Sequence, residues 1–144
     1  MKCYLTEAEK LIREHETNDP ERIAREMGIA VLYLPMSRVY GLAVALGEHR
    51  LIGVKADLPE EAQKLVVAHE LGHFVLHPQG SFMFILDHTF FYGKHEYQAN
   101  MFACALRMGE ELARYEAAIK ELAAGRVDRL IDAFGENRYG TPTD

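Results

Sequence analysis

The sequence has no tryptophan, only two cysteines and no long apolar run. Cys3 and Cys104 form no CxxC pair, and Cys104 lies in the apolar run 101–106, where a buried, reduced thiol is expected. No apolar stretch approaches the roughly 20 residues that span a bilayer, and the charged residues close to Met1 argue against a secretory signal. These absences predict a cytoplasmic protein without a membrane segment.

Positive charge is also scarce. The 144 residues contain 16 Lys and Arg against 22 Asp and Glu, a formal net charge of −6, which argues against a nucleic-acid-binding surface. With 49% hydrophobic and 26% charged residues, the composition is that of a globular protein, and a chain of this length can fold without a metal or a disulfide. We therefore expect a single domain over residues 1–144, in which any metal serves function rather than stability.

The first half of the chain changes from helical to strand patterns. Thr6 and Glu9 have the spacing of a capping box, and apolar residues at helical spacing follow as far as Glu16. Asn18-Asp19-Pro20 predicts the start of a short second helix that ends at Gly28. Aliphatic and β-branched residues then predict three strands, of which the last two form a hairpin: 30–34, 39–46 and 50–54.

The second half is predicted to be mainly helical. A helix over 58–77, capped by Asp57 and stopped by Pro78, precedes a loop over 78–93. Further helices are expected over 94–108, 110–123 and 127–134, with a frayed polar tail at 137–144. The order of elements predicts an α+β fold in which a small three-stranded sheet packs on the 58–77 helix, with the other helices flanking it.

Histidine, by contrast, is abundant: the chain has seven, and five of them fall between positions 69 and 95. Two belong to the run His69-Glu70-Leu71-Gly72-His73, an HExxH pattern. Histidines four residues apart share a helix face and can bind one zinc ion, while Glu70 can reach a water on that metal and act as general base. The alternative is a pair of core histidines, but imidazoles buried on this apolar face without partners would cost about 1–3 kcal/mol each.

A catalytic zinc site needs a third protein ligand. The metzincin spacing would place a histidine at position 79, which is Gln, and His77 lies at the helix end, where hydrogen bonding is the simpler role. Glu96 is the better candidate, because it begins a helix whose small residues would let it pack close to the HExxH helix. Its alternative role is that of an acidic residue favoured by the helix dipole. Asn100, one turn after Glu96, is placed to hold a ligand histidine by a hydrogen bond.

Two separated motifs carry a resemblance to a known family. AHELGH and LH fall within Leu65–His77, and Glu96-Tyr97-Gln98-Ala99-Asn100 follows with Phe102-Ala103 in matching order and spacing. Together with Asp19-Pro20 and Gly41, these residues resemble the ImmA/IrrE family of metallopeptidases over roughly residues 19–108. The resemblance implies a zincin-like fold, with His69, His73 and Glu96 as metal ligands and Glu70 as general base.

The sequence departs from the family pattern at several points. Gln98 stands where the family usually has a second glutamate, Gly109 replaces a proline, and the elements that follow in longer members are missing. The pattern does not single out the residue that stabilises the oxyanion. The candidates lie near the predicted site, and each has packing or surface exposure as its simpler role: His88, Tyr92, His95 and Tyr97.

The resemblance also implies a biological role, that of a cytoplasmic zinc protease that cleaves a helix-turn-helix repressor of a phage, mobile element or stress response. We therefore expect a zinc endopeptidase acting on a regulatory protein, with the peptide added to an exposed sheet edge. The alternative is a non-proteolytic anti-repressor or toxin–antitoxin binding module on the same scaffold, and a third hypothesis is a metal-dependent hydrolase of a non-peptide substrate. The sequence indicates no direct contact with nucleic acid and leaves the oligomeric state undefined.

Overall fold

The computed structural model describes residues 3–77, 80–87, 93–125 and 127–136. The fold is α+β, as predicted, but its sheet has four strands rather than the three expected. The elements follow in this order: α1 (Tyr4–His15), α2 (Pro20–Glu26), β1 (Ala30–Leu34), β2 (Val39–Leu46), β3 (His49–Lys55), α3 (Glu60–Leu76), β4 (Phe82–Asp87), α4 (Lys94–Met108), the 3-10 turn η1 (Gly109–Glu111), α5 (Leu112–Ala123) and α6 (Val127–Gly135).

The sheet has the strand order β1-β3-β2-β4. The predicted hairpin of β2 and β3 is confirmed, while β1 runs parallel to β3. β4 pairs antiparallel with β2, so the prediction of a loop throughout 78–93 is wrong for its central part. The pairing of β2 with β4 shifts register between Val39 and Gly41, which is the sign of a β-bulge. The bulge lies at the end of β2 that contains Gly41.

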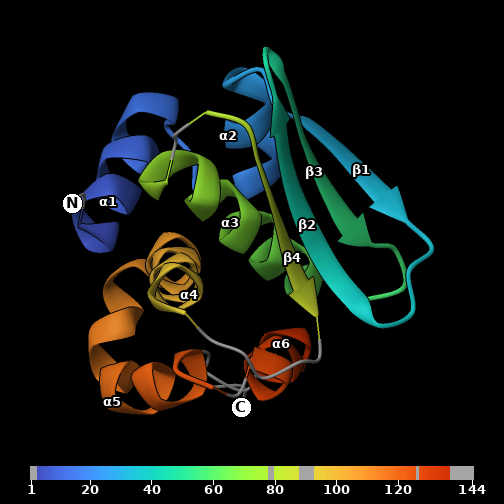
Figure 1. The fold of residues 1–144 in the computed structure, drawn as a ribbon. Coiled ribbons are helices and arrows are strands. Elements are labelled where there is room, and N and C mark those ends of the chain that lie inside the picture. Colours follow the sequence, from blue (N-terminus) through green and yellow to red (C-terminus); the bar gives the residue numbers. More distant parts are fainter. Residues whose placement is uncertain (1–2, 78–79, 88–92, 126, 137–144) are drawn as a thin grey trace.

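Helix α3 forms the centre of the molecule. It packs against β2 and β3 on one side and against α4 on the other, with α1, α2 and α6 at its flanks (Figure 1). Every residue from Leu65 to Leu76 is buried. A helix that is covered all round is expected to be apolar all round, and the polar exceptions in this run therefore need an explanation. They are His69, Glu70 and His73.

The helix starts show where local patterns succeed and fail. Asp19 caps α2 as predicted, because its side chain accepts a hydrogen bond from the Glu21 backbone N–H. The capping box predicted at Thr6 is wrong, since α1 already begins at Tyr4. Asp57 does not cap α3 either, because that helix starts after Pro59. In both failures the helix starts two to three residues away from the polar residue expected to cap it.

The remaining sequence predictions concern cysteines and membrane segments. Cys104 is buried in α4, as predicted, and Cys3 is exposed; both are free thiols. Within the described parts of the chain, no helix combines the length and the apolar composition needed to cross a membrane. The predicted tail at 137–144 lies outside the described residues.

Candidate metal centre

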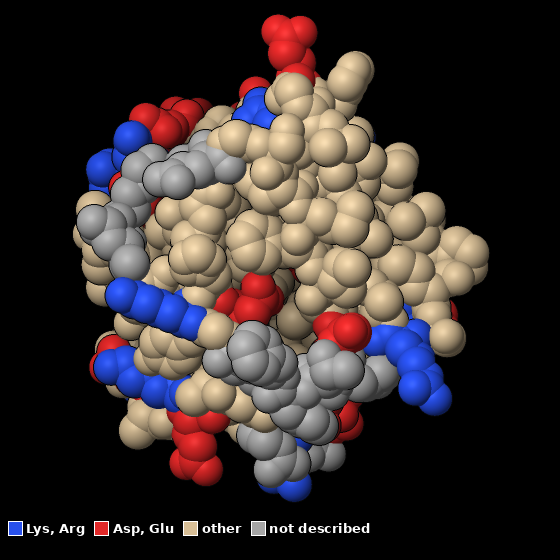
Figure 2. All heavy atoms as spheres, viewed as in Figure 1, with Lys and Arg blue, Asp and Glu red and all other residues tan. Residues whose placement is uncertain are grey.

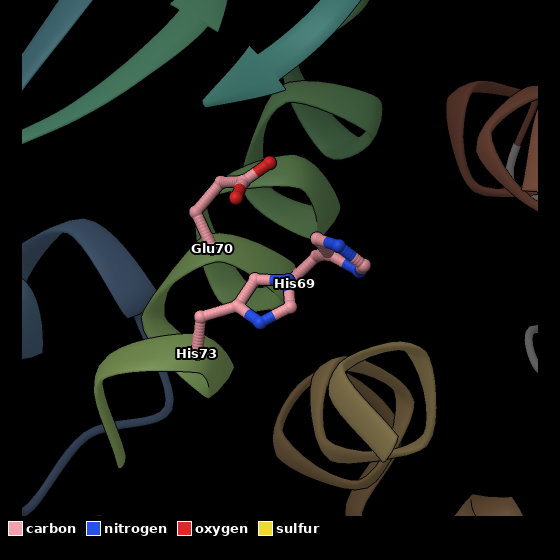
Figure 3. Close-up of side chains that lie close together, drawn as sticks. All are labelled: His69, Glu70 and His73. Atoms are coloured by element: carbon pink, nitrogen blue, oxygen red, sulfur yellow. The ribbon is translucent and has the colours of Figure 1, made fainter. Parts of the chain in front are cut away.

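The HExxH residues lie in the second half of α3. His69 is 2% exposed, and Glu70 and His73 are fully buried. One candidate ligand atom from each residue lies within 4.8 Å of the others. Both imidazoles lie on the side of α3 that faces α4, with ring centroids 5.0 Å apart, whereas Glu70 points toward the sheet (Figure 3). Helix α3 thus presents its imidazoles and its carboxyl group to different neighbours.

Glu96 joins the two imidazoles from the first turn of α4. Its Oε1 atom lies 3.0 Å from His69 Nε2, and its Oε2 atom lies 3.2 Å from His73 Nε2. Helices α3 and α4 can pack closely because Gly72 of α3 has no Cβ. A Cβ at this position would lie 3.0 Å from the ring of Phe102 in α4. The space-filling view shows acidic side-chain atoms inside a hollow at the centre of this face (Figure 2).

The pKa values of Glu96, His69 and His73 depend on one another, because these side chains lie close together. Burial acts to raise the pKa of Glu96, but the nearby His69 and His73 outweigh it and hold the pKa of that carboxyl well below its usual range. Burial lowers the pKa of His73 to about 4, against the opposing attraction of Glu96. For His69, burial also acts to lower the pKa, but the hydrogen bond and charge of Glu96 and the charge of Glu70 raise it above its ordinary value. The group therefore contains an ionised Glu96 that faces two histidines.

The Nδ1 atom of His69, which is the ring nitrogen that does not face Glu96, contacts a side chain of α4. This atom lies 2.7 Å from Asn100 Oδ1, and the Asn100 Nδ2 group donates a hydrogen bond of 2.9 Å to the carbonyl oxygen of Ala123 at the end of α5. Asn100 is itself buried. The orientation of the His69 ring is thus fixed by a side chain that is anchored on the backbone of another helix, in the place where the sequence predicted such a contact.

The Nδ1 atom of His73, which likewise does not face Glu96, contacts another histidine of α3 instead of a residue of α4. This atom lies 3.2 Å from Nδ1 of His77, and His77 Nε2 lies 3.0 Å from Oε1 of Gln98. His95 stacks on the outer ring, with 4.0 Å between the centroids of His77 and His95. His77 therefore contacts a candidate ligand instead of converging with His69 and His73 on a common point.

Glu70 has no comparable partner. Both of its carboxylate oxygens are buried without a hydrogen bond from any described residue, and Oε2 lies so close to Gly41 of β2 that a Cβ on that glycine would be 2.7 Å away. Burial raises the pKa of Glu70 to about 8, with His69 opposing the shift and Glu96 adding to it. A buried carboxyl group without partners is costly, and such groups cluster at functional sites.

The donor set fits a metal ion. Two imidazole nitrogens and a carboxylate are a common ligand set of catalytic zinc, which leaves a further position to water or substrate. His73 Nε2 is buried and has no aligned hydrogen-bond partner among the described residues, although Glu96 lies 3.2 Å away. A cation between the two would use this lone pair. His69, His73 and Glu96 are thus the residues that could hold a metal, with Glu70 beside it.

The predicted oxyanion candidates are only partly visible. His88 and Tyr92 lie outside the described residues. Tyr97 is partly buried against the core and close enough to Tyr4 of α1 and Lys120 of α5 to influence their pKa values. Among the described candidates, His95 is the one whose ring stacks on the histidine cluster.

Sequence reasoning missed Phe84, which lies in β4. Its ring stacks on His73 with a centroid separation of 3.8 Å and an interplanar angle of 5°. A signal was present, because Phe82–Leu86 is a short, continuous apolar run bounded by Gly80-Ser81 and Asp87, and a run of this length is consistent with a strand. Phe84 thus forms one wall of the imidazole cluster from the sheet side.

Comparison with known proteins identifies the family of this chain. Residues 24–128 match peptidase family M78, described as the IrrE N-terminal-like domain. A curated relative, "Uncharacterized immunity region protein 2" of Bacillus phage phi105, is 29% identical over 100 residues, which cover 68% of this chain and 63% of the relative. The matched segment thus spans less than two thirds of that relative's length. No solved structure matches significantly. Since the family match covers most of the chain and includes every residue of the candidate metal centre, this chain belongs to the IrrE N-terminal-like family of metallopeptidases.

Proposed function

We propose that the chain is a zinc-dependent endopeptidase in which His69, His73 and Glu96 bind the metal and Glu70 is the general base. One observation carries the proposal: two buried Nε2 atoms and the Glu96 carboxylate converge within 3.0–3.2 Å, next to a buried carboxyl group that has no hydrogen bond from the described residues. Zinc is the metal that this combination of imidazole and carboxylate ligands suits.

The mechanism assigns a proton transfer to Glu70. Zinc bound at this site would polarise the scissile carbonyl and make a neighbouring water molecule more acidic. Glu70 accepts the proton of the attacking water on its carboxylate and passes it to the amine that leaves. Burial raises the pKa of Glu70 to about 8 without metal, and the positive charge of a bound zinc ion would lower it toward the near-neutral value that suits both accepting and returning a proton.

The surrounding residues keep the reacting groups in place and exclude water. Asn100 fixes the His69 ring through its contact with the Ala123 carbonyl, and Phe84 covers one face of His73. Fixed ligands of this kind lower the cost of reaching the reactive geometry. Asn100 is therefore a positioning residue in this proposal, and it does not itself contact the substrate.

The peptide substrate is proposed to bind along β4. This strand lies at the edge of the sheet, and its Phe84 ring stacks on His73. A peptide that pairs with β4 would run past the imidazole cluster, held by main-chain hydrogen bonds that make little demand on its sequence. Specificity would then come from side-chain contacts on either side of the cluster.

The substrate that we propose is a regulatory protein, namely a helix-turn-helix repressor. Support comes from the resemblance of the sequence to the ImmA/IrrE family and from the printed name of the phage relative, which refers to an immunity region. The protein would then act in the cytoplasm on a protein partner, without contacting nucleic acid directly. Its net charge of −6 agrees with that last point.

The decisive experiment compares Glu70→Gln with the wild type. Each purified protein is loaded with zinc, its metal content is measured, and it is incubated with candidate helix-turn-helix repressors, beginning with any that is encoded next to its gene. We expect about one zinc ion per chain in both proteins, cleavage by the wild type, and a loss of about 10³-fold in the cleavage rate of Glu70→Gln. Glu60→Gln is the matched control, because Glu60 is an exposed carboxyl group of the same helix.

Two results would contradict this proposal. Cleavage by Glu70→Gln at a rate close to that of the wild type would exclude Glu70 as the general base. An intact repressor held in a stable complex, with equal affinity for the wild type and Glu70→Gln, would instead favour the non-proteolytic anti-repressor or toxin–antitoxin module.

A further inference from the structure

The sheet is covered by helices on one side only. Helix α3 packs on β2 and β3, and α2 packs on β1. Figure 1 shows the helices gathered on this side of the sheet. The side chains on the opposite side therefore need a separate account.

The register of the strands shows which side chains point to that opposite side. Directly opposed residues of neighbouring strands lie on the same face of a sheet. Val31, Ile52 and Ala43 form a row that is buried against the helices, so the rows on either side of it point away from them. We call the surface that these two rows form the outer face: Ala30, Leu51, Val44 and Met83 in one row, and Leu32, Gly53, Leu42 and Ile85 in the other.

The outer face is apolar, although a sheet face that is exposed to water is normally polar. Neither of its two rows contains a polar side chain. Met83 is 63% exposed, Ile85 50% and Leu32 46%. Figure 2 shows a broad surface over β2 and β4 without charged atoms, which appear at its margins. The outer face thus has the composition of a surface that another molecule covers.

The outer face is large enough for a weak protein interface. Four strands about 4.8 Å apart, with five to six paired residues at about 3.3 Å each, measure about 19 by 18 Å. This is about 350 Å² in flat projection, and the relief of the side chains makes the accessible area larger. Two such faces packed together would bury about 1,000 Å² of accessible surface, which is near the lower limit of specific interfaces.

We propose that the outer face is the interface of a homodimer, in which the sheets of two copies pack on each other. A face without charges has no pattern that would select an oppositely charged partner, whereas a second copy presents the same apolar surface through two-fold symmetry. Sheets packed in this way lie about 10 Å apart with interdigitating side chains. The edge of β4 stays free in this arrangement, so the dimer depends neither on the proposed peptide site nor on a metal.

The test is sedimentation velocity of the full chain at concentrations from about 1 to 200 µM. We expect the average mass to rise from the 16.4 kDa of one chain toward twice that value, with a Kd on the order of 10 µM for an interface of this size. High salt should not weaken the dimer, because an apolar interface has no ion pairs to screen and the charge of −6 on each copy repels the other mainly at low salt.

Two substitutions place a charge on opposite sides of the outer face. Ile85→Lys changes β4 and Leu32→Lys changes β1, which are the two edge strands. Each should raise the Kd at least about 100-fold, because the dimer would have to bury an unpaired ammonium group. Leu5→Lys is the matched control, since Leu5 is 43% exposed on α1, away from the sheet; its Kd should stay within threefold of the wild type.

Methyl NMR spectra of the wild type provide a second readout that needs no variant. The methyl signals of Met83 and Ile85 should shift between low and high protein concentration, while those of Leu5 stay in place. Concentration-dependent shifts confined to residues outside the outer face would contradict the proposal.

A wild type that stays monomeric at about 200 µM would overturn the homodimer. So would a dimer that neither Ile85→Lys nor Leu32→Lys weakens, or one that Leu5→Lys weakens to the same extent as these two. None of the measurements needs zinc or a substrate. A protein that dimerises as expected but cleaves no repressor would therefore count against the proposed function and leave the dimer intact.

Discussion

The two sides of α3 are both tightly packed, yet they treat their polar groups in opposite ways. On the side that faces α4, His69 and His73 meet the ionised Glu96. On the side that faces the sheet, Glu70 is buried without a hydrogen bond from the described residues, and its pKa is raised to about 8. The α4 side thus has the features of a place that binds a cation, and the sheet side those of a place that holds a proton.

A glycine makes room on each side. Gly72 lies between α3 and α4, where a Cβ would be 3.3 Å from the Ala99 backbone. Gly41 lies in β2, where a Cβ would be 2.7 Å from Glu70 Oε2 and 2.5 Å from Val66. Real Cβ atoms essentially never come as close to another atom as the two distances at Gly41. Substituting each glycine by alanine therefore disturbs one side of α3 at a time.

The largest effect is expected from Gly41→Ala. The added methyl group must displace the Glu70 carboxylate, and a positioned general base contributes about 10²–10⁴-fold to a hydrolytic rate. We expect cleavage to fall by about 10³-fold while zinc affinity stays within threefold of the wild type. Gly53→Ala is the matched control, because the atoms nearest to a Cβ there belong to the side chains of Leu34 and Leu42, at 3.1 Å, and not to Glu70. Equal activity of the two variants would show that Gly41 makes no room for Glu70.

The next effect concerns the pH dependence of stability in the metal-free protein. The pKa of Glu70 rises from 4.5 to about 8 on folding, so above about pH 4.5 the folded protein keeps a proton that the unfolded chain releases. The contribution of Glu70 to stability is therefore complete at low pH and is lost progressively up to about pH 8.

Urea unfolding of the wild type and Glu70→Gln tests this dependence, since all other titrating groups occur in both proteins. Between pH 5.5 and 7, we expect the wild type to lose about 2 kcal/mol relative to Glu70→Gln. A difference between the two proteins that is constant with pH would mean that Glu70 is ionised in the folded state, and that the sheet side of α3 does not hold a proton.

The smallest effect is expected from Gly72→Ala. The methyl group would push α3 and α4 apart by a few tenths of an ångström, which lengthens the distances from Glu96 to the histidines, while alanine gains about 1 kcal/mol of helix propensity. We expect zinc affinity to fall by about tenfold with little change in the unfolding free energy. Gly125→Ala, where a Cβ meets no atom within 4 Å, should leave both unchanged. An unaltered zinc affinity in Gly72→Ala would mean that close helix packing is not needed for the metal.

The sequence predicted the parts of the site that depend on local geometry. His69, Glu70 and His73 lie on one helix, and their relative directions follow from its periodicity. The contact of Asn100 with His69 could also be predicted, because Asn100 lies one turn from Glu96 on α4. The contact between His77 and Gln98 could not, since it depends on how far α3 and α4 slide along each other.

The failure to predict strand β4 from the sequence has a similar cause. β4 follows Gly80 and pairs with β2, which lies some 40 residues earlier in the chain. Its run of five apolar residues, Phe82–Leu86, has no alternation, and periodicity alone cannot assign such a short run to a strand. The caps expected at Thr6 and Asp57 failed because side chains of this type satisfy local backbone groups in turns as well as at helix starts. Tertiary packing then decides where each helix begins.

The strand order also bears on how the chain folds. β2 and β3 are joined by a short turn. β4 is separated from its partner β2 by both β3 and α3 in the chain, so their pairing closes a long loop. Closing a long loop costs entropy before its contacts form, so local hairpins precede such distant pairs. We therefore expect the ring of Phe84 to reach His73 late in folding, so that the wall of the imidazole cluster is completed when most of the surrounding core is already assembled.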